Sequence, residues 1–222
     1  MADLPDFSAS VHGACRPAVP RLHLITNRQL CADRAQEAIV AEAARGGLGA
    51  VQLREKDLTP RALLDEAERL KWVIGATPLI VNGAAEIARA VDAVGVHLPG
   101  AAGSVATARA VIGATALIGR SIHSLEGALD AEAEGADYVM LGTIFATASK
   151  PGRAPAGLSL VTLVAGAIRI PVIAIGGIDE GNVAATLAAG AWGVAVMSGI
   201  LRAAAPTIAV ARLRAIIEEG AL

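Results

Sequence analysis

A chain of 222 residues is long enough for one large domain with a well-buried core. Its formal net charge of −2 and aromatic content of 2% argue against nucleic-acid binding, which usually needs a basic field and stacking side chains. Hydrophobic residues make up 54% of the chain, but Gly, Pro or charged residues interrupt each apolar stretch before the roughly 20 residues that a membrane span needs, so we expect no membrane partner.

The N-terminal segment lacks the basic start, apolar region and small-residue cleavage site that are typical of a signal peptide. We expect residues 1–20 to be a disordered tail and residues 21–222 to form a single domain. Cys15 and Cys31 are too few for a disulfide framework and have no metal-ligand spacing. These features predict a cytoplasmic protein.

Short β-branched segments alternate with Ala-rich amphipathic segments from Arg21 onward. That alternation is typical of parallel strands connected by helices. The expected strands are Leu22–Thr26, Ala50–Arg54, Leu79–Asn82, Gly95–Leu98, Ala116–Arg120, Tyr138–Leu141, Val172–Ile175 and Gly193–Met197. Eight such units predict an α/β protein with a closed (β/α)₈ TIM barrel, and an open doubly wound sheet is the alternative. The segment between Leu141 and Leu158 is rich in Gly, Pro, Ser and Thr, which predicts a long loop.

Glycine-rich turns follow the last two expected strands. Gly176 and Gly177 follow the seventh, and Ser198 and Gly199 follow the eighth. Active sites of TIM barrels lie at the C-terminal ends of the strands, and phosphate often binds after strands seven and eight. Since glycine lets backbone N–H groups approach phosphate oxygens, we expect a phosphate site here. The alternative is that these glycines only form tight turns.

Polar residues cluster at the end of the second expected strand. Alternation sends Gln52 and Arg54 to one face of that strand. Gln52 offers donors and an acceptor, Arg54 a bidentate fork, and Lys56 a mobile charge for an anionic substrate. The alternative is an ion pair between Arg54 and Glu55. Asn82 ends the third strand and is a further candidate for substrate binding.

The fifth expected strand leads into Ser121 and His123 at the same end of the barrel. Because imidazole has its ordinary pKa near neutrality, His123 is the first candidate for acid–base chemistry, the alternative being that it only precedes the next helix. His97 lies within a strand and is interpreted as structural. In the long loop, Thr147 and Lys150 are candidates for contacting a bound anion, although loop lysines are commonly only solvated.

The motifs LHLIT, VQLREK, LIVN, GVHL, IGRSIHS, GADYVMLGTIF, ASKPG, IPVIAIGG and GVAVMSGI occur in this order between Arg21 and Leu213. Together they resemble the thiamine phosphate synthase and thiazole tautomerase superfamily, and the likeness covers nearly all of that range. The resemblance implies that a synthase would join a pyrimidine pyrophosphate to a thiazole phosphate with magnesium, using two aspartates. The corresponding positions here are Gly83 and Ala102.

The missing aspartates and the IGRSIHS motif make the chain more similar to the tautomerase branch. The resemblance then implies a metal-free isomerase that aromatises a carboxylated thiazole phosphate and needs no cofactor. His123 would transfer the proton, with Glu55 as second acid–base group, and Arg54 or Lys56 would face the carboxylate. The phosphate would rest on Gly176, Gly177, Ser198 and Gly199. The alternatives are a magnesium-dependent synthase and a non-catalytic phosphate-binding or regulatory protein; a homo-oligomer is compatible with each.

Overall fold

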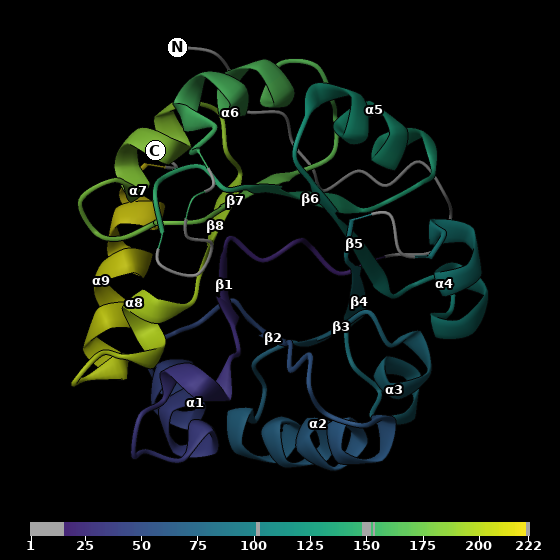
Figure 1. Ribbon diagram of the computed structural model, residues 1–222, viewed down its shortest axis with the longest axis vertical. Helices are drawn as coiled ribbons and strands as arrows, with labels where there is room; N and C mark the ends of the chain where they lie inside the picture. Colours follow the sequence, from purple (N-terminus) through teal and green to yellow (C-terminus); the bar gives the residue numbers. More distant parts are fainter. Residues whose placement is uncertain (1–15, 101–102, 148–151, 153, 221–222) are drawn as a thin grey trace.

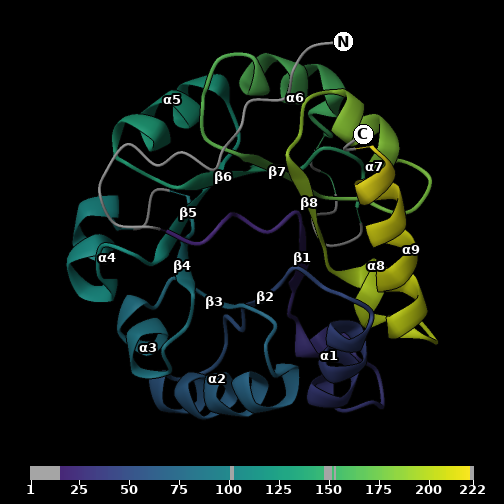
Figure 2. The ribbon, with the colours of Figure 1, turned by 180° about the vertical axis from the view of Figure 1, so that it is seen from behind.

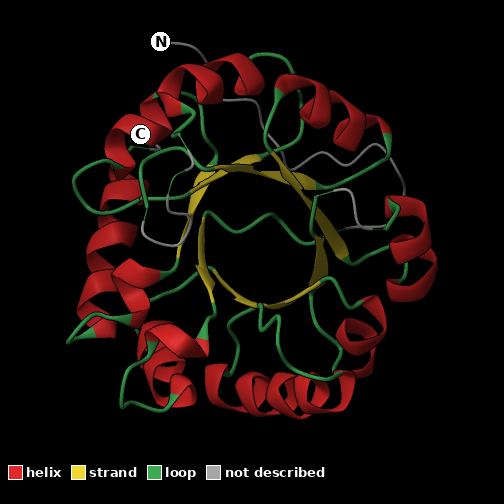
Figure 3. Ribbon diagram, in the orientation of Figure 1, coloured by secondary structure: helices red, strands yellow, loops and turns green. Residues whose placement is uncertain are grey.

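The computed structural model describes residues 16–100, 103–147, 152 and 154–220. Eight parallel strands pair in chain order, and β1 pairs with both β2 and β8, so the sheet closes into a barrel (Figure 3). The strands are β1 (Leu22–Ile25), β2 (Ala50–Leu53), β3 (Leu79–Asn82), β4 (Gly95–Leu98), β5 (Leu117–Ile122), β6 (Tyr138–Gly142), β7 (Val172–Ile175) and β8 (Gly193–Val196). The predicted TIM barrel is confirmed, and the open sheet is excluded.

Helices surround the barrel on its outside (Figure 1). They are the 3₁₀ helix η1 (Arg28–Leu30), α1 (Gln36–Arg45), α2 (Pro60–Ile74), α3 (Ala85–Ala90), α4 (Val105–Ile112), α5 (Leu125–Ala133), α6 (Gly157–Ala165), α7 (Val183–Ala188), α8 (Ser198–Leu201) and α9 (Pro206–Glu219). Hydroxyl side chains cap three of these helices, at Thr59, Ser104 and Ser124. In the described part of the chain, none of the helices combines the length and the apolar character required to cross a membrane.

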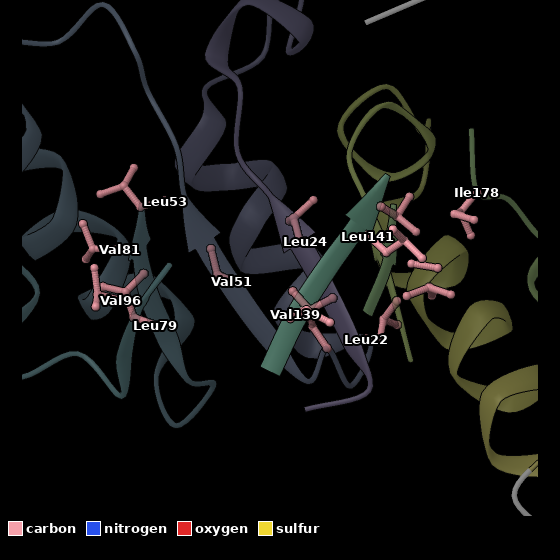
Figure 4. Packing of buried hydrophobic residues seen from close by; sticks show 14 of the residues in the cluster. Leu22, Leu24, Val51, Leu53, Leu79, Val81, Val96, Val139, Leu141 and Ile178 are labelled. Atoms are coloured by element: carbon pink, nitrogen blue, oxygen red, sulfur yellow. The ribbon is translucent and has the colours of Figure 1, made fainter. Parts of the chain in front are cut away.

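Alternating side chains of each strand divide between two buried layers. Outward-facing residues such as Val51 and Leu53 on β2, or Val139 and Leu141 on β6, belong to the layer between the barrel and its helices (Figure 4). The inward-facing residues form a second cluster inside the barrel: Ile25, Ala50, Ile80, Leu117, Tyr138, Met140, Ile173 and Ala195. Burial on both faces explains why the strands are almost continuously apolar in sequence.

Tyr138 is the single tyrosine of the chain and lies fully buried inside the barrel. Its ring packs over Gly119 of the neighbouring strand β5. A Cβ atom at Gly119 would stand 2.1 Å from Tyr138 Cζ, which is far inside van der Waals contact. Glycine on β5 therefore makes the space that the large ring occupies.

Residues 16–20 cross the end of the barrel at which the strands begin, seen as the purple segment spanning the ring in Figures 1 and 2. Arg16 donates to the Ala114 carbonyl at 3.0 Å and forms an ion pair with Asp137. On the other side of the barrel, Trp192 Nε1 donates to the Val19 carbonyl at 2.9 Å. This N-terminal segment covers one end of the barrel, while residues 1–15 of the expected tail lie outside the described residues.

Candidate active site

A cavity of about 300 Å³ opens at the end of the barrel opposite the N-terminal segment. This is the end at which the parallel strands terminate, where TIM barrels hold their active sites. Every strand contributes to its wall, through Ile25, Gln52, Asn82, His97, Ser121, Met140, Ile175 and Ala195. The wall is thus mostly apolar on the β6, β7, β8 and β1 side and polar from β2 to β5.

Gln52 of β2 and Arg54, which directly follows that strand, both line the cavity, and Leu53 between them packs outward. The Gln52 amide is buried, and its Nε2 makes no hydrogen bond with the described residues. A buried donor without a partner is costly, so this amide is available to a ligand. Burial lowers the pKa of Arg54, against the opposing effect of Glu55, and its guanidinium remains a cation at the wall of the cavity.

Glu55 and Lys56 do not line the cavity. The Glu55 carboxylate turns toward η1, where it accepts a hydrogen bond from the Arg28 backbone N–H at 3.1 Å and pairs with the Arg28 guanidinium at 3.6 Å. Burial raises its pKa, and the contacts with Thr26 and Arg28 oppose that rise. Glu55 therefore pairs with Arg28, and the Lys56 side chain is exposed to solvent.

His97 joins the interior of the barrel to the floor of the cavity. Its Nε2 lies 2.8 Å from Ser121 Oγ, and its Nδ1 lies 3.3 Å from the Tyr138 hydroxyl. Burial, followed by the nearby charges of His23, Arg54 and Arg120, lowers the pKa of His97 to about 3. His97 is therefore neutral at physiological pH and has one N–H donor and one acceptor nitrogen.

His123 stands at the mouth of the cavity, just past the end of β5. Its Nδ1 forms a hydrogen bond with the Gly142 carbonyl on β6. Because a carbonyl oxygen only accepts, this contact requires a proton on Nδ1 and fixes the ring against the β6 wall. The following Ser124 accepts from Gly127 N–H at 3.2 Å and begins α5, so a helix start and a cavity residue coexist in this motif.

The glycines after β7 serve a packing role at the edge of the cavity. Gly176 and Gly177 have φ angles of +104° and +65°, which side chains with a Cβ rarely adopt. A Cβ at Gly176 would lie 2.5 Å from Thr143 Cγ2, and one at Gly177 would lie 2.5 Å from the Ala146 carbonyl oxygen. Both glycines line the cavity together with Ser198, whereas Gly199 does not. Gly176 and Gly177 therefore form a tight turn and also line the cavity.

Two further predicted residues come from the long loop between β6 and α6. Thr147 lines the cavity, and Lys150 lies outside the described residues. Sequence reasoning missed three polar residues of the wall, Asn27, Thr143 and Arg202. Arg202 follows α8 and stands four positions after Ser198, a spacing that places two residues on the same side of a helix and that could have identified it.

The described residues do not fit a magnesium ion in this cavity. Mg²⁺ usually binds one or two protein carboxylates, but the described wall contains neither Asp nor Glu. Gly83, at the end of β3, has no side chain to offer, and the other expected ligand position, Ala102, lies outside the described residues. No group of three or more His, Cys, Asp or Glu residues suited to a metal occurs in the described ranges. The wall instead presents cations and neutral donors, which complement an anion.

Comparison with known proteins identifies the family. The family described as Thiamine monophosphate synthase (TMP-TENI) matches residues 22–200. Proteins named Thiamine-phosphate synthase from Haloarcula marismortui and Chloroflexus aurantiacus are 39% and 41% identical, over 90% and 89% of this chain and 97% and 92% of their own. A solved thiamine phosphate pyrophosphorylase from Pyrococcus furiosus is 34% identical, with a TM-score of 0.81 over 90% of this chain and 96% of that one.

These similarities correct the expected function. The sequence favoured a thiazole tautomerase because of a few positions, chiefly Gly83, Ala102 and the motif around His123. Relatives that match about nine-tenths of the chain are named synthases instead. The tautomerase prediction is therefore wrong: a few motif positions are outweighed by similarity distributed over the whole barrel.

Proposed function

Because the chain belongs to the thiamine monophosphate synthase family, we propose that it is a thiamine-phosphate synthase. It would join a pyrimidine pyrophosphate to a thiazole phosphate, with pyrophosphate as the leaving group. The observation that carries this proposal is the cavity wall, in which cationic and neutral donor groups converge without a carboxylate among the described residues. Such a wall complements two phosphorylated substrates.

The two cations of the described wall would divide the anionic groups between them. Arg54 directly follows β2, and Arg202 follows α8 after β8; β1 lies between these strands in the barrel. Arg54 would stabilise charge on the departing pyrophosphate. Arg202, together with Ser198 and the glycines after β7, would hold the thiazole phosphate. Bringing two bound substrates together converts a bimolecular reaction into a step within one complex.

The remaining polar groups would orient the organic parts of the substrates. Gln52 has an unpaired buried amide nitrogen, which suits an acceptor on a ring. The apolar side chains Met140, Ile175 and Ile178 line the same cavity and suit the faces of aromatic rings. None of these roles requires the protein to hold a metal ion.

Incubation with both substrates tests the proposal, with condensation product and released pyrophosphate measured separately. The reaction is run with magnesium and with a chelator, and product in stoichiometric amount with pyrophosphate in either condition supports a synthase. Arg54→Ala should lose most turnover, and Lys56→Ala, which changes a cation outside the cavity, is the matched control. Binding of both substrates without product in either condition would overturn the proposal in favour of a non-catalytic phosphate-binding protein.

A further inference from the structure

We infer that Tyr138 and His97 are positioning residues that orient the Ser121 hydroxyl as a hydrogen-bond donor toward an anionic ligand in the cavity. The three side chains form one line from the barrel interior to the cavity floor. The Tyr138 hydroxyl lies 3.3 Å from His97 Nδ1, and His97 Nε2 lies 2.8 Å from Ser121 Oγ. Ser121 ends this line and lines the cavity.

The direction of these hydrogen bonds follows from the proton on Tyr138. Burial strongly raises the pKa of this phenol, Asp137 adds to the rise, and the Gln52 side chain opposes it. His97 Nδ1 is the hydrogen-bond partner that the structure gives the hydroxyl, and a buried O–H requires an acceptor. Tyr138 therefore donates to Nδ1.

The tautomer of His97 then determines the role of Ser121. A neutral imidazole that accepts at Nδ1 carries its proton on Nε2. Nε2–H donates to Ser121 Oγ, so the Ser121 hydrogen is not directed at His97. Among the described residues the Ser121 hydroxyl has no other hydrogen bond, so its hydrogen is free to point into the cavity that Ser121 lines. Successive donors aligned in this way polarise one another.

The fold keeps this line rigid. Tyr138 and His97 have exposed fractions of 0% and 1%, and the Tyr138 ring occupies the space made by Gly119. The His23 ring also packs against Tyr138, with ring centroids 5.7 Å apart. Because neither ring can rotate into solvent, the orientation exists before any ligand binds, as is needed for stabilising charge at low cost.

Two-bond ¹H–¹⁵N correlation spectra of the full chain, labelled on histidine, test the direction of the hydrogen bonds from Tyr138 through His97 to Ser121. The chemical shifts of the two ring nitrogens distinguish the Nε2–H from the Nδ1–H form, and His97→Gln identifies the signal by removing it. We expect His97 as the Nε2–H form from pH 8 to pH 5, and a mixture of forms in Tyr138→Phe. An Nδ1–H form in the wild type would overturn the inference, whatever reaction the protein performs.

A binding measurement tests the consequence and rests on the proposed function, because the probe is inorganic pyrophosphate. Ser121→Ala should weaken pyrophosphate binding about 10- to 100-fold, the effect of one hydrogen bond to a charged group, and Tyr138→Phe should weaken it about 3- to 10-fold. Ser124→Ala, which changes a hydroxyl that caps α5, should bind like the wild type.

The two measurements separate the possible failures. If Ser121→Ala and Tyr138→Phe are both folded and both bind pyrophosphate with wild-type affinity, the role assigned to Tyr138, His97 and Ser121 would be overturned. If the wild type does not bind pyrophosphate while its His97 is in the Nε2–H form, the proposed synthase fails and the orientation of Ser121 stands.

Discussion

Gly119→Ala should unfold the barrel more easily than its small change in volume suggests. The added Cβ would lie 2.1 Å from Tyr138 Cζ and 2.5 Å from both Cε2 and the hydroxyl oxygen, so the ring must move by about 1.4 Å to reach an ordinary contact of about 3.5 Å. Overpacking of this kind typically costs about 1–3 kcal/mol, and the displaced hydroxyl also loses its hydrogen bond to His97, worth about 1 kcal/mol. We expect a loss of about 3 kcal/mol in the free energy of unfolding.

Urea denaturation measures this loss, and two comparisons identify its cause. Gly127→Ala adds the same methyl group within α5, where the nearest atom is 3.5 Å away, and should stabilise by up to about 1 kcal/mol. In a Tyr138→Leu background, Gly119→Ala should cost less than about 1 kcal/mol, because the clashing ring is gone and the cost of the smaller side chain cancels. An equal cost in both backgrounds would refute the reasoning.

Three further predictions concern charge. Arg54→Ala should lower kcat/KM about 100-fold, by loss of a charge-assisted hydrogen bond, with Lys56→Ala nearly unaffected; equal losses in steady-state kinetics would contradict the assignment of the wall. The folded pKa values of His23 and His97, about 4 and about 3, lie below the ordinary 6.5, so unfolding takes up protons and stability present above pH 6.5 falls toward pH 4. Each histidine contributes up to about 3 kcal/mol to that fall; urea titrations should show it, with a shallower slope in His23→Gln, and a pH-independent midpoint would exclude it. Asp137→Asn, which removes the charge facing two arginines, should cost about 2 kcal/mol in thermal or urea unfolding, and wild-type stability would show that the pairs contribute nothing.

The barrel could be predicted because it depends on local patterns. Buried parallel strands are apolar on both faces, and each expected strand overlaps an observed one. The largest difference is at β5, which extends to Ile122, two residues beyond the expected Arg120. Ser121 in this extension interrupts the apolar pattern, but Ile122 still pairs with Leu141 of β6. Pairing with a neighbour is information that a local pattern does not contain.

The site could be predicted from the sequence only where a residue's position along one strand determines the direction of its side chain. Alternation alone predicts that Gln52 and Arg54, the residue directly after β2, point to the same side. The partner of Glu55 could not be inferred in the same way, because Arg28 lies 27 positions earlier and belongs to a separate short helix. Likewise, His97 lies within hydrogen-bond distance of Tyr138, which is 41 positions away in the sequence. Neither local motif indicates this contact. The sequence could therefore predict which polar residues belong to the site, but not which of them contact one another across separate strands.

The N-terminal segment makes the barrel a tube closed at one end. Residues 16–20 cover the end where the strands begin, and the interior cluster around Tyr138 fills the space above them. In the described part of the chain, the floor formed by His97 and Ser121 faces the cavity that His123 also lines, at the end opposite the N-terminal segment. When two ligands share such a cavity, the deeper one has to arrive first and depart last. For two ligands in one such cavity, the closed end of the barrel would therefore fix the order in which they bind and are released.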